Sequence, residues 1–195
     1  MGTDYVVTDK LSSILQACSQ GQLRKGRLNV KAPKGQQWSL YFHLGLLIGD
    51  AGGVHPVRRW RRQLSQYCPG LGVDADSILK GNGSRCWDYG SLAELVIKKE
   101  ILREQMVVVV EGSIAEVLFD ILQQEELLRY HAQAQLTYTY IPEETLYSSP
   151  LAYVKADQAW KQAQQAWETW LQAGLVNYSP NMAPVIWKRD ELRQQ

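Results

Sequence analysis

The chain has 195 residues, a net charge of +1 and 45% hydrophobic residues, which is the composition of an ordinary globular protein. This length fits one large domain or two small ones, and no internal repeat or low-complexity tract is visible. The longest apolar run, residues 106–110, is far shorter than the ~20 residues of a membrane helix. The N-terminus also lacks the pattern of a signal peptide. These features exclude a fibrous or membrane-spanning protein, and we expect a soluble, cytoplasmic one.

Charge is distributed unevenly along the chain. Residues 24–62 contain nine lysines and arginines but a single acidic residue, Asp50, whereas residues 63–195 carry an excess of acidic residues. The N-terminal part should therefore present an electropositive surface.

The first seven residues show no pattern and are expected to be frayed. A helix should follow, capped by Thr8 or Asp9 and ended by Gly21. Its apolar residues recur at the spacing i, i+3, i+4, i+7, which predicts one buried face made of Leu11, Ile14, Leu15 and Cys18.

Three short strands are predicted next, at 27–31, 36–43 and 46–50, with turns at 33–35 and 44–45. Alternation of apolar and polar residues gives each strand a polar face, with Gln37 and Ser39 among its members, and an apolar face. The side chains expected to be buried are Leu28, Val30, Trp38, Leu40 and Phe42. An antiparallel meander of this kind needs helices to cover its apolar face.

Gly52 and Gly53 predict a sharp turn before a helix that begins near Pro56 and stops at residues 68–70. At 100° per residue its inward stripe contains Val57, Trp60, Leu64 and Cys68. The arginines of the sequence RRWRR fall on the opposite side (Arg58, Arg59 and Arg62) or at its border (Arg61).

The second half is predicted to be mainly helical. Ser91 and Glu94 have the spacing of a capping box at the start of one helix, and residues 103–125 are predicted to form two helices broken near Gly112 and Ser113. A strand is predicted at 136–141 and a helix at 155–174. The face of this last helix is interpreted as core or, alternatively, as a docking face: Ala156, Trp160, Ala163, Trp167 and Trp170.

Together these elements predict an α+β fold, with a small antiparallel β-meander flanked by helices and followed by a mainly helical second half. The expected units are residues 1–70, with the meander and the arginine-rich helix, and residues 71–195, packed against them as part of one domain.

No catalytic, metal-binding or cofactor-binding signature is found. The histidines His43, His55 and His131 are far apart, and none has a cysteine or carboxylate at ligand spacing. There is no GxSxG elbow, P-loop or GxGxxG sequence. The cysteines Cys18, Cys68 and Cys86 form no CxxC pair, so reduced thiols are expected. We predict a protein that is not an enzyme and that needs no cofactor.

The sequence RRWRR is the strongest candidate for a binding site, because outward guanidinium groups grip carboxylates or phosphates through forked, charge-assisted hydrogen bonds. The predicted partner-binding residues are His55, Arg58, Arg59, Arg61 and Arg62. Two other interpretations stay open. The arginines could face only solvent, or they could pair with acidic residues of the second half. A nucleic-acid-binding regulator is the alternative function, although the near-neutral overall charge and the lack of a groove-reading motif favour a protein partner.

The sequences GRLNV, QQWSLYFHLGLLI, AGGVHPVRRWRRQL and YCP resemble the PATAN domain, the N-terminal half of cyanobacterial response regulators of the PatA and PixG type. The resemblance continues more loosely through LAELVIKKEILREQMVVVVEGSIAEVLFDILQQEE and YSPNMAPVI, and so covers most of residues 10–190.

The resemblance implies an effector domain that normally precedes a receiver domain and acts in phototaxis, type IV pilus motility or cell patterning. It also implies a protein partner, with the pilus motor ATPase as one candidate, and leaves homodimerisation open. Because the receiver is absent, we expect either a piece of a longer protein or a stand-alone variant. Gly49 and Asp50 stand where many relatives carry an aromatic residue, so the partner contacted by that rim is expected to differ.

Overall fold

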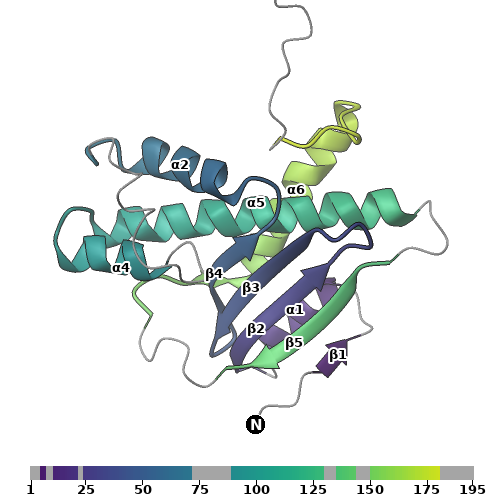
Figure 1. The fold of residues 1–195 in the computed structure, drawn as a ribbon, viewed down its shortest axis with the longest axis horizontal. Coiled ribbons are helices and arrows are strands. Elements are labelled where there is room, and N and C mark those ends of the chain that lie inside the picture. Colours follow the sequence, from purple (N-terminus) through teal and green to yellow (C-terminus); the bar gives the residue numbers. More distant parts are fainter. Residues whose placement is uncertain are drawn as a thin grey trace, which may run out of the picture.

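The computed structural model describes residues 5–7, 11–21, 24–71, 89–129, 135–143 and 150–180. The helices are α1 (Leu11–Ser19), α2 (Pro56–Tyr67), α4 (Tyr89–Ile97), α5 (Arg103–Arg129) and α6 (Ala156–Gln172). The strands are β1 (Tyr5–Val7), β2 (Lys25–Lys31), β3 (Gln37–His43), β4 (Leu46–Gly52), β5 (Thr137–Pro142) and β6 (Val154–Lys155). The predicted α+β fold is confirmed, with an antiparallel sheet flanked by helices and a mostly helical second half (Figure 1).

The described strands form one antiparallel sheet in the order β1-β5-β2-β3-β4-β6. Strands β2, β3 and β4 are the predicted meander. Strand β5, which the sequence also predicted, pairs with the free side of β2, and β1 pairs in turn with β5. The expectation of a frayed N-terminus is therefore wrong for Tyr5–Val7. The sheet draws strands from both sides of residue 70, so the two predicted units share it.

The predicted faces of the meander are confirmed. The apolar residues on the inward face, Leu28, Val30, Trp38, Leu40 and Phe42, are all 0% exposed. On the opposite face, the Ser39 hydroxyl donates a hydrogen bond to Asn29 Oδ1 at 2.8 Å, and Gln37 is exposed. Tyr41 and His43 also belong to that face by alternation, yet both are buried, so the face is not uniformly open to solvent.

An irregularity in strand pairing changes the face of one acidic residue. In β4, Leu47 pairs with Phe42 and Asp50 pairs with Leu40, so three steps along β4 correspond to two steps along β3. Directly paired residues share a face of a sheet, so this bulge places Asp50 on the apolar side together with Leu47. Bulges re-aim side chains in this way because the extra residue breaks the two-residue alternation.

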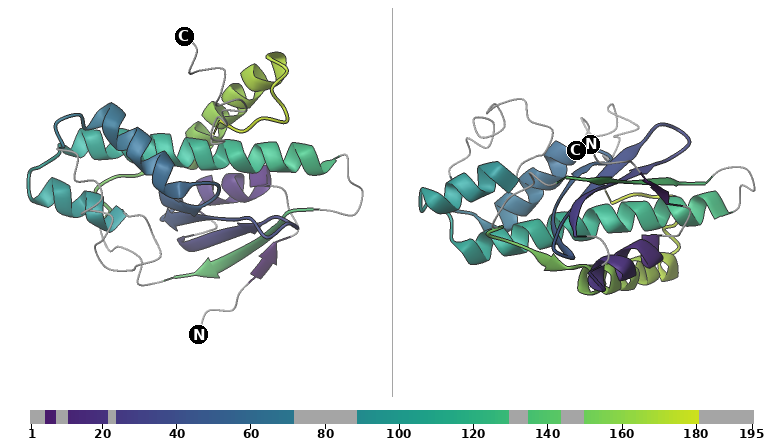
Figure 2. Two further views of the ribbon diagram at one scale, coloured as in Figure 1. Left: turned by 45° about the horizontal axis from the view of Figure 1, so that its top comes forward. Right: turned by 90° about the horizontal axis from the view of Figure 1, so that it is seen from below.

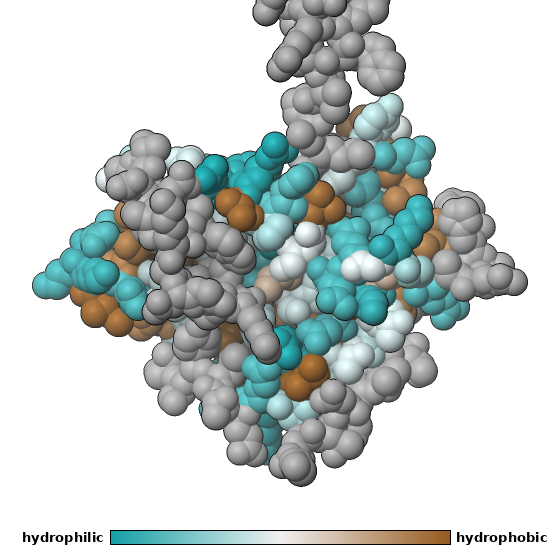
Figure 3. All heavy atoms as spheres, viewed as in Figure 1, coloured by the Kyte–Doolittle hydropathy of each residue, from teal (hydrophilic) through white to brown (hydrophobic). Residues whose placement is uncertain are grey.

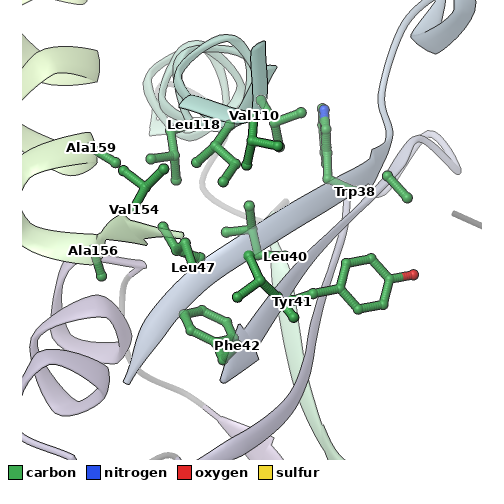
Figure 4. Packing of buried hydrophobic residues seen from close by; sticks show 14 of the residues in the cluster. Trp38, Leu40, Tyr41, Phe42, Leu47, Val110, Leu118, Val154, Ala156 and Ala159 are labelled. Carbon is green, nitrogen blue, oxygen red and sulfur yellow. The ribbon is translucent and has the colours of Figure 1, made fainter. Parts of the chain in front are cut away.

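Helices cover the apolar face of the sheet. Views from two directions place α5 across this face, with α1 and α6 on the same side (Figure 2). Leu40 points from the sheet toward Val110 and Leu118 of α5, whereas Tyr41 points away from them (Figure 4). The predicted stripe of α1 is confirmed, because Leu11, Ile14, Leu15 and Cys18 are all buried. The Thr8 or Asp9 cap of this helix lies outside the described residues.

The predicted break near Gly112 and Ser113 is wrong, because α5 is one continuous helix from Arg103 to Arg129. The glycine serves instead as a contact point between two helices. A Cβ atom on Gly112 would lie 2.7 Å from the side-chain Cδ of Gln63 on α2, so any other residue here would force the buried Gln63 side chain to move. Ser113, the next residue, is 0% exposed.

Helices α4 and α6 lie close to their predicted positions. Helix α4 begins at Tyr89, so Ser91 lies inside its first turn and does not cap it. Helix α6 begins at Ala156 and buries Ala156, Ala163 and Trp167 of the predicted face, with Trp160 and Trp170 partly exposed. None of the helices in the described part of the chain combines the length and apolar character that crossing a membrane requires.

Candidate functional site

The predicted partner-binding residues lie on helix α2 and, for His55, immediately before it, and the preceding turn fixes where the helix begins. Gly53 has φ +79°, and a Cβ atom there would lie 2.9 Å from Trp38 Nε1 of β3. The Gly53 N–H donates to the Gln37 carbonyl at 2.7 Å, which ties the turn to the sheet. Pro56 occupies the first turn of the helix, where its missing N–H leaves no hydrogen bond unmade. The helix then packs along α5 (Figure 1).

Arg59 was predicted to face outward, and this prediction is wrong. Its side chain is 0% exposed and runs back to β4, where Nη2 donates to Asp50 Oδ1 at 2.7 Å and to the Gly52 carbonyl at 3.1 Å. Nε donates to Ser113 Oγ on α5 at 3.2 Å. Asp50 is itself only 1% exposed. Arg59 therefore joins α2 to both the sheet and α5, and it leaves the set of residues that a partner can contact on the surface.

The reason for this error lies in the rotation of the helix about its axis. The buried residues of α2 are Arg59, Trp60 and Gln63, whereas Val57 and Leu64 of the predicted stripe are only partly buried. At 100° per residue this shifts the buried side by roughly a quarter of a turn toward the polar residues. This orientation is stabilised by polar side chains on β4 and α5 that accept hydrogen bonds from Arg59 and Gln63: Asp50, Ser113 and Glu116. Trp60 is buried as predicted, at 5% exposure.

Arg62 forms an ion pair with Glu116 of α5. Its Nε donates to Glu116 Oε1 at 3.3 Å, and its Nη2 donates to the other carboxylate oxygen of Glu116. The Gln63 amide donates to the same Oε1 at 2.5 Å. Glu116 belongs to α5, so one arginine does pair with the acidic second half, as one of the open interpretations allowed. The Arg62 side chain nevertheless stays 39% exposed.

Arg58, Arg61 and His55 remain on the outside of the molecule, where all three residues are exposed. The helix sequence PVRRWRRQLSQY contains no acidic residue that could neutralise them within α2. A space-filling view shows hydrophilic side chains along the edge of the molecule where α2 lies (Figure 3). We call His55, Arg58, Arg61 and Arg62 the α2 arginine surface. Four of the five residues predicted to bind a partner thus lie on one surface, and Arg59 lies beneath it.

Several cysteine and tyrosine side chains of the described residues are buried in the core. Burial raises the pKa of the Cys18 thiol to about 12, and burial followed by repulsion from Cys18 raises the pKa of Tyr140 to about 12. Burial also raises the pKa of Tyr138, whose hydroxyl donates to Glu125. Cys18 and Cys68 are free thiols, whereas Cys86 and His131 lie outside the described residues. Within the described ranges, no three metal-binding side chains gather in one place.

Sequence reasoning missed the residues that hold α2 in position. Asp50, Ser113, Gln63 and Glu116 carry no motif. Two of them, Ser113 and Glu116, lie on α5, which is distant in sequence from α2. One signal was available for Asp50, since it is the only acidic residue among nine basic ones in residues 24–62. A lone carboxylate in an apolar strand next to an arginine-rich helix is a candidate for a buried ion pair.

Comparison with known proteins returns no match, whether the chain is compared with family models, curated protein sequences or solved structures.

Proposed function

We propose that this chain is a non-catalytic protein-interaction domain that binds an acidic region of a partner protein through the α2 arginine surface. The observation that carries this proposal is that the residues of RRWRR are of two kinds, buried ones that anchor the helix and exposed ones that a partner can reach. Arg59 and Trp60 hold the helix on the body, while Arg58 and Arg61 stand exposed on a helix without any acidic residue. Because the helix itself is held in place, only the exposed arginine side chains need to become ordered when they form forked contacts with carboxylates.

The biological setting is proposed from the sequence resemblance to the PATAN domain. In that setting the protein acts in a two-component-type signalling system that controls type IV pilus motility, phototaxis or cell patterning, and the pilus motor ATPase is the candidate partner. The motifs that carry the resemblance include AGGVHPVRRWRRQL, which contains the turn and the helix that form the α2 arginine surface.

The test is a binding measurement with the purified pilus motor ATPase of a cyanobacterium, using the double variant Arg58→Glu/Arg61→Glu. We expect binding to be lost because attraction to carboxylates becomes repulsion, while thermal unfolding stays close to that of the wild type. The matched control is Lys98→Glu/Lys161→Glu, which makes the same charge change at two exposed lysines on α4's C-terminal side and on α6. Binding that survives in the arginine variant, or that is lost equally in the lysine variant, would contradict the proposal.

The nucleic-acid alternative is tested with a 20-base-pair DNA duplex, which should lose affinity steeply between 50 and 200 mM salt if it is held through phosphates. Contacts between arginines and carboxylates also weaken with salt, so the duplex and the protein partner are compared at the same salt concentration. Tight, salt-sensitive binding of the duplex that disappears in the arginine variant would favour the alternative.

A further inference from the structure

The Arg59–Asp50 and Arg62–Glu116 ion pairs of α2 differ in how easily an outside ligand can reach them. Arg59 and Asp50 are 0% and 1% exposed, so no partner can contact either charge without moving the helix. Arg62 and Glu116 are 39% and 20% exposed. An ion pair this exposed is weak because water screens it, and it exchanges partners at small cost. Arg62 is therefore the arginine whose internal partner can be replaced.

The position of Arg62 makes such a replacement relevant to binding. Residues four apart on a helix are neighbours on one face, so Arg62 lies next to exposed Arg58. Glu116 approaches Arg62 with both carboxylate oxygens, which is the forked geometry that an acidic partner would also use. In the unbound protein the Glu116 carboxylate is therefore paired with the Arg62 guanidinium, which would otherwise be available to an acidic partner.

Glu116 is held in this position from a second side. The Gln63 amide donates to Glu116 Oε1 at 2.5 Å, and Gln63 is itself fixed against Gly112 of α5, where no side chain intervenes. If Arg62 turned toward another carboxylate, Glu116 would keep the hydrogen bond from Gln63 and its partial exposure to water. Releasing Arg62 thus leaves no buried charge without a partner, in contrast to what releasing Arg59 would do.

We propose that Glu116 is an internal competitor for the α2 arginine surface: an acidic protein segment binds by displacing the Glu116 carboxylate from Arg62 and pairing with Arg58 and Arg62 together. This inference rests on the proposed function and specifies how the site is regulated. A single carboxylate gains little affinity at Arg62, because its new ion pair only replaces the one between Arg62 and Glu116. A segment with several carboxylates can reach both arginines and therefore binds more tightly. The surface thereby discriminates against isolated acidic side chains.

The experiment measures binding of a fluorescein-labelled hexaglutamate peptide by fluorescence anisotropy at low salt. Glu116→Gln should tighten binding about two- to fivefold, the range expected when one exposed ion pair no longer competes. The matched control is Glu111→Gln, which removes the same charge from the same helix at a residue that accepts hydrogen bonds from Gln158 and Gln162 of α6. This control should increase the affinity for the peptide by less than half as much as Glu116→Gln does. Thermal unfolding of each variant checks that the fold is unchanged.

A double-mutant cycle shows whether the effect passes through Arg62. Glu116→Gln should give no gain in an Arg62→Gln background, because the contested guanidinium is then absent. Equal gains in the two glutamate variants, a gain that persists without Arg62, or no binding by either the wild type or Glu116→Gln would overturn the proposal. Peptide binding that is unaffected by Arg58→Glu/Arg61→Glu would contradict both the proposed function and the joint pairing with Arg58 and Arg62. Peptide binding that is lost in this variant, without a specific gain from Glu116→Gln, would leave the proposed function standing and overturn only the competition by Glu116.

Discussion

Arg59 on α2 and Asp50 on β4 form a buried ion pair, with Nη2 and Oδ1 2.7 Å apart and both side chains at most 1% exposed. Burying two charges is costly, and the pair repays this cost only when both members are present and well hydrogen-bonded. The additional contacts of Arg59 with the Gly52 carbonyl and Ser113 Oγ supply such hydrogen bonds.

We expect either single substitution at this pair to be strongly destabilising. Asp50→Asn leaves a buried guanidinium without its counter-charge, and Arg59→Met leaves a buried carboxylate, so each should lower the free energy of unfolding by about 3–5 kcal/mol. The double variant should cost clearly less than the sum of the two, because neither charge is then stranded. Urea unfolding of the three variants checks this. Additive effects would mean that the two side chains contribute independently.

Trp60 is expected to be a main apolar anchor of α2. Its side chain is buried beside Arg59, so Trp60→Ala should leave a cavity and lower the free energy of unfolding by about 3–5 kcal/mol. Arg58→Ala, two residues earlier on the exposed side, serves as the control and should change stability by no more than ~0.5 kcal/mol. Similar losses of unfolding free energy in the two variants would mean that α2 is rotated differently about its axis and does not bury Trp60 in preference to Arg58.

Gly112 should behave in the opposite way from most helix glycines. Replacing an interior helix glycine with alanine normally stabilises a protein by about 1 kcal/mol. Here the new methyl group would collide with the Gln63 side chain, so Gly112→Ala should be destabilising. Combining it with Gln63→Ala removes the collision and should recover stability relative to Gly112→Ala alone. Chemical unfolding of both variants decides whether α2 and α5 meet at this point.

The protein should lose stability at alkaline pH. The pKa of Cys18 rises from 9.0 to about 12 and that of Tyr140 from 10.0 to about 12, because burial disfavours their charged forms. The unfolded chain releases these protons first, so each group's contribution is complete below its unfolded pKa and declines as pH rises toward about 12.

The loss should amount to about 1.4 kcal/mol per pH unit for each titrating group. Cys18→Ala should flatten the decline that begins near pH 9, whereas Tyr140→Phe should affect only the part above about pH 10. Urea unfolding measured from pH 8 to pH 11 provides the slopes. A decline in the Cys18→Ala variant as steep as in the wild type would show that the thiol does not contribute.

The sequence predicted the parts of the fold where a simple repeat decides burial. Alternation placed Leu28, Trp38 and Phe42 inside, and helical spacing placed the stripe of α1, because apolar side chains follow the geometry of their own element. Arg59 could not be placed in the same way. Its burial depends on Asp50, and the face of Asp50 depends on a bulge that breaks the alternation of β4.

Gly112 was also predicted wrongly because its role depends on a contact with another element. In sequence a glycine beside a serine suggests a helix break, since both residues are poor helix formers. The structure uses the missing side chain to bring α2 close, and nothing local in α5 reveals that a second helix passes there. Consequently the sequence predicted the surface position of four of its five candidate binding residues, but not the groups that hold α2 in place.

The place of β5 in the sheet has a consequence for the order of folding. Strand β1 pairs with β5, and β5 in turn covers the edge of β2. During synthesis β1 is made well before its partner strand, and until residues 137–142 emerge the meander presents β2 as an open edge. Exposed edges of this kind recruit other strands. We therefore expect the nascent chain to be prone to self-association until β5 has paired with β2.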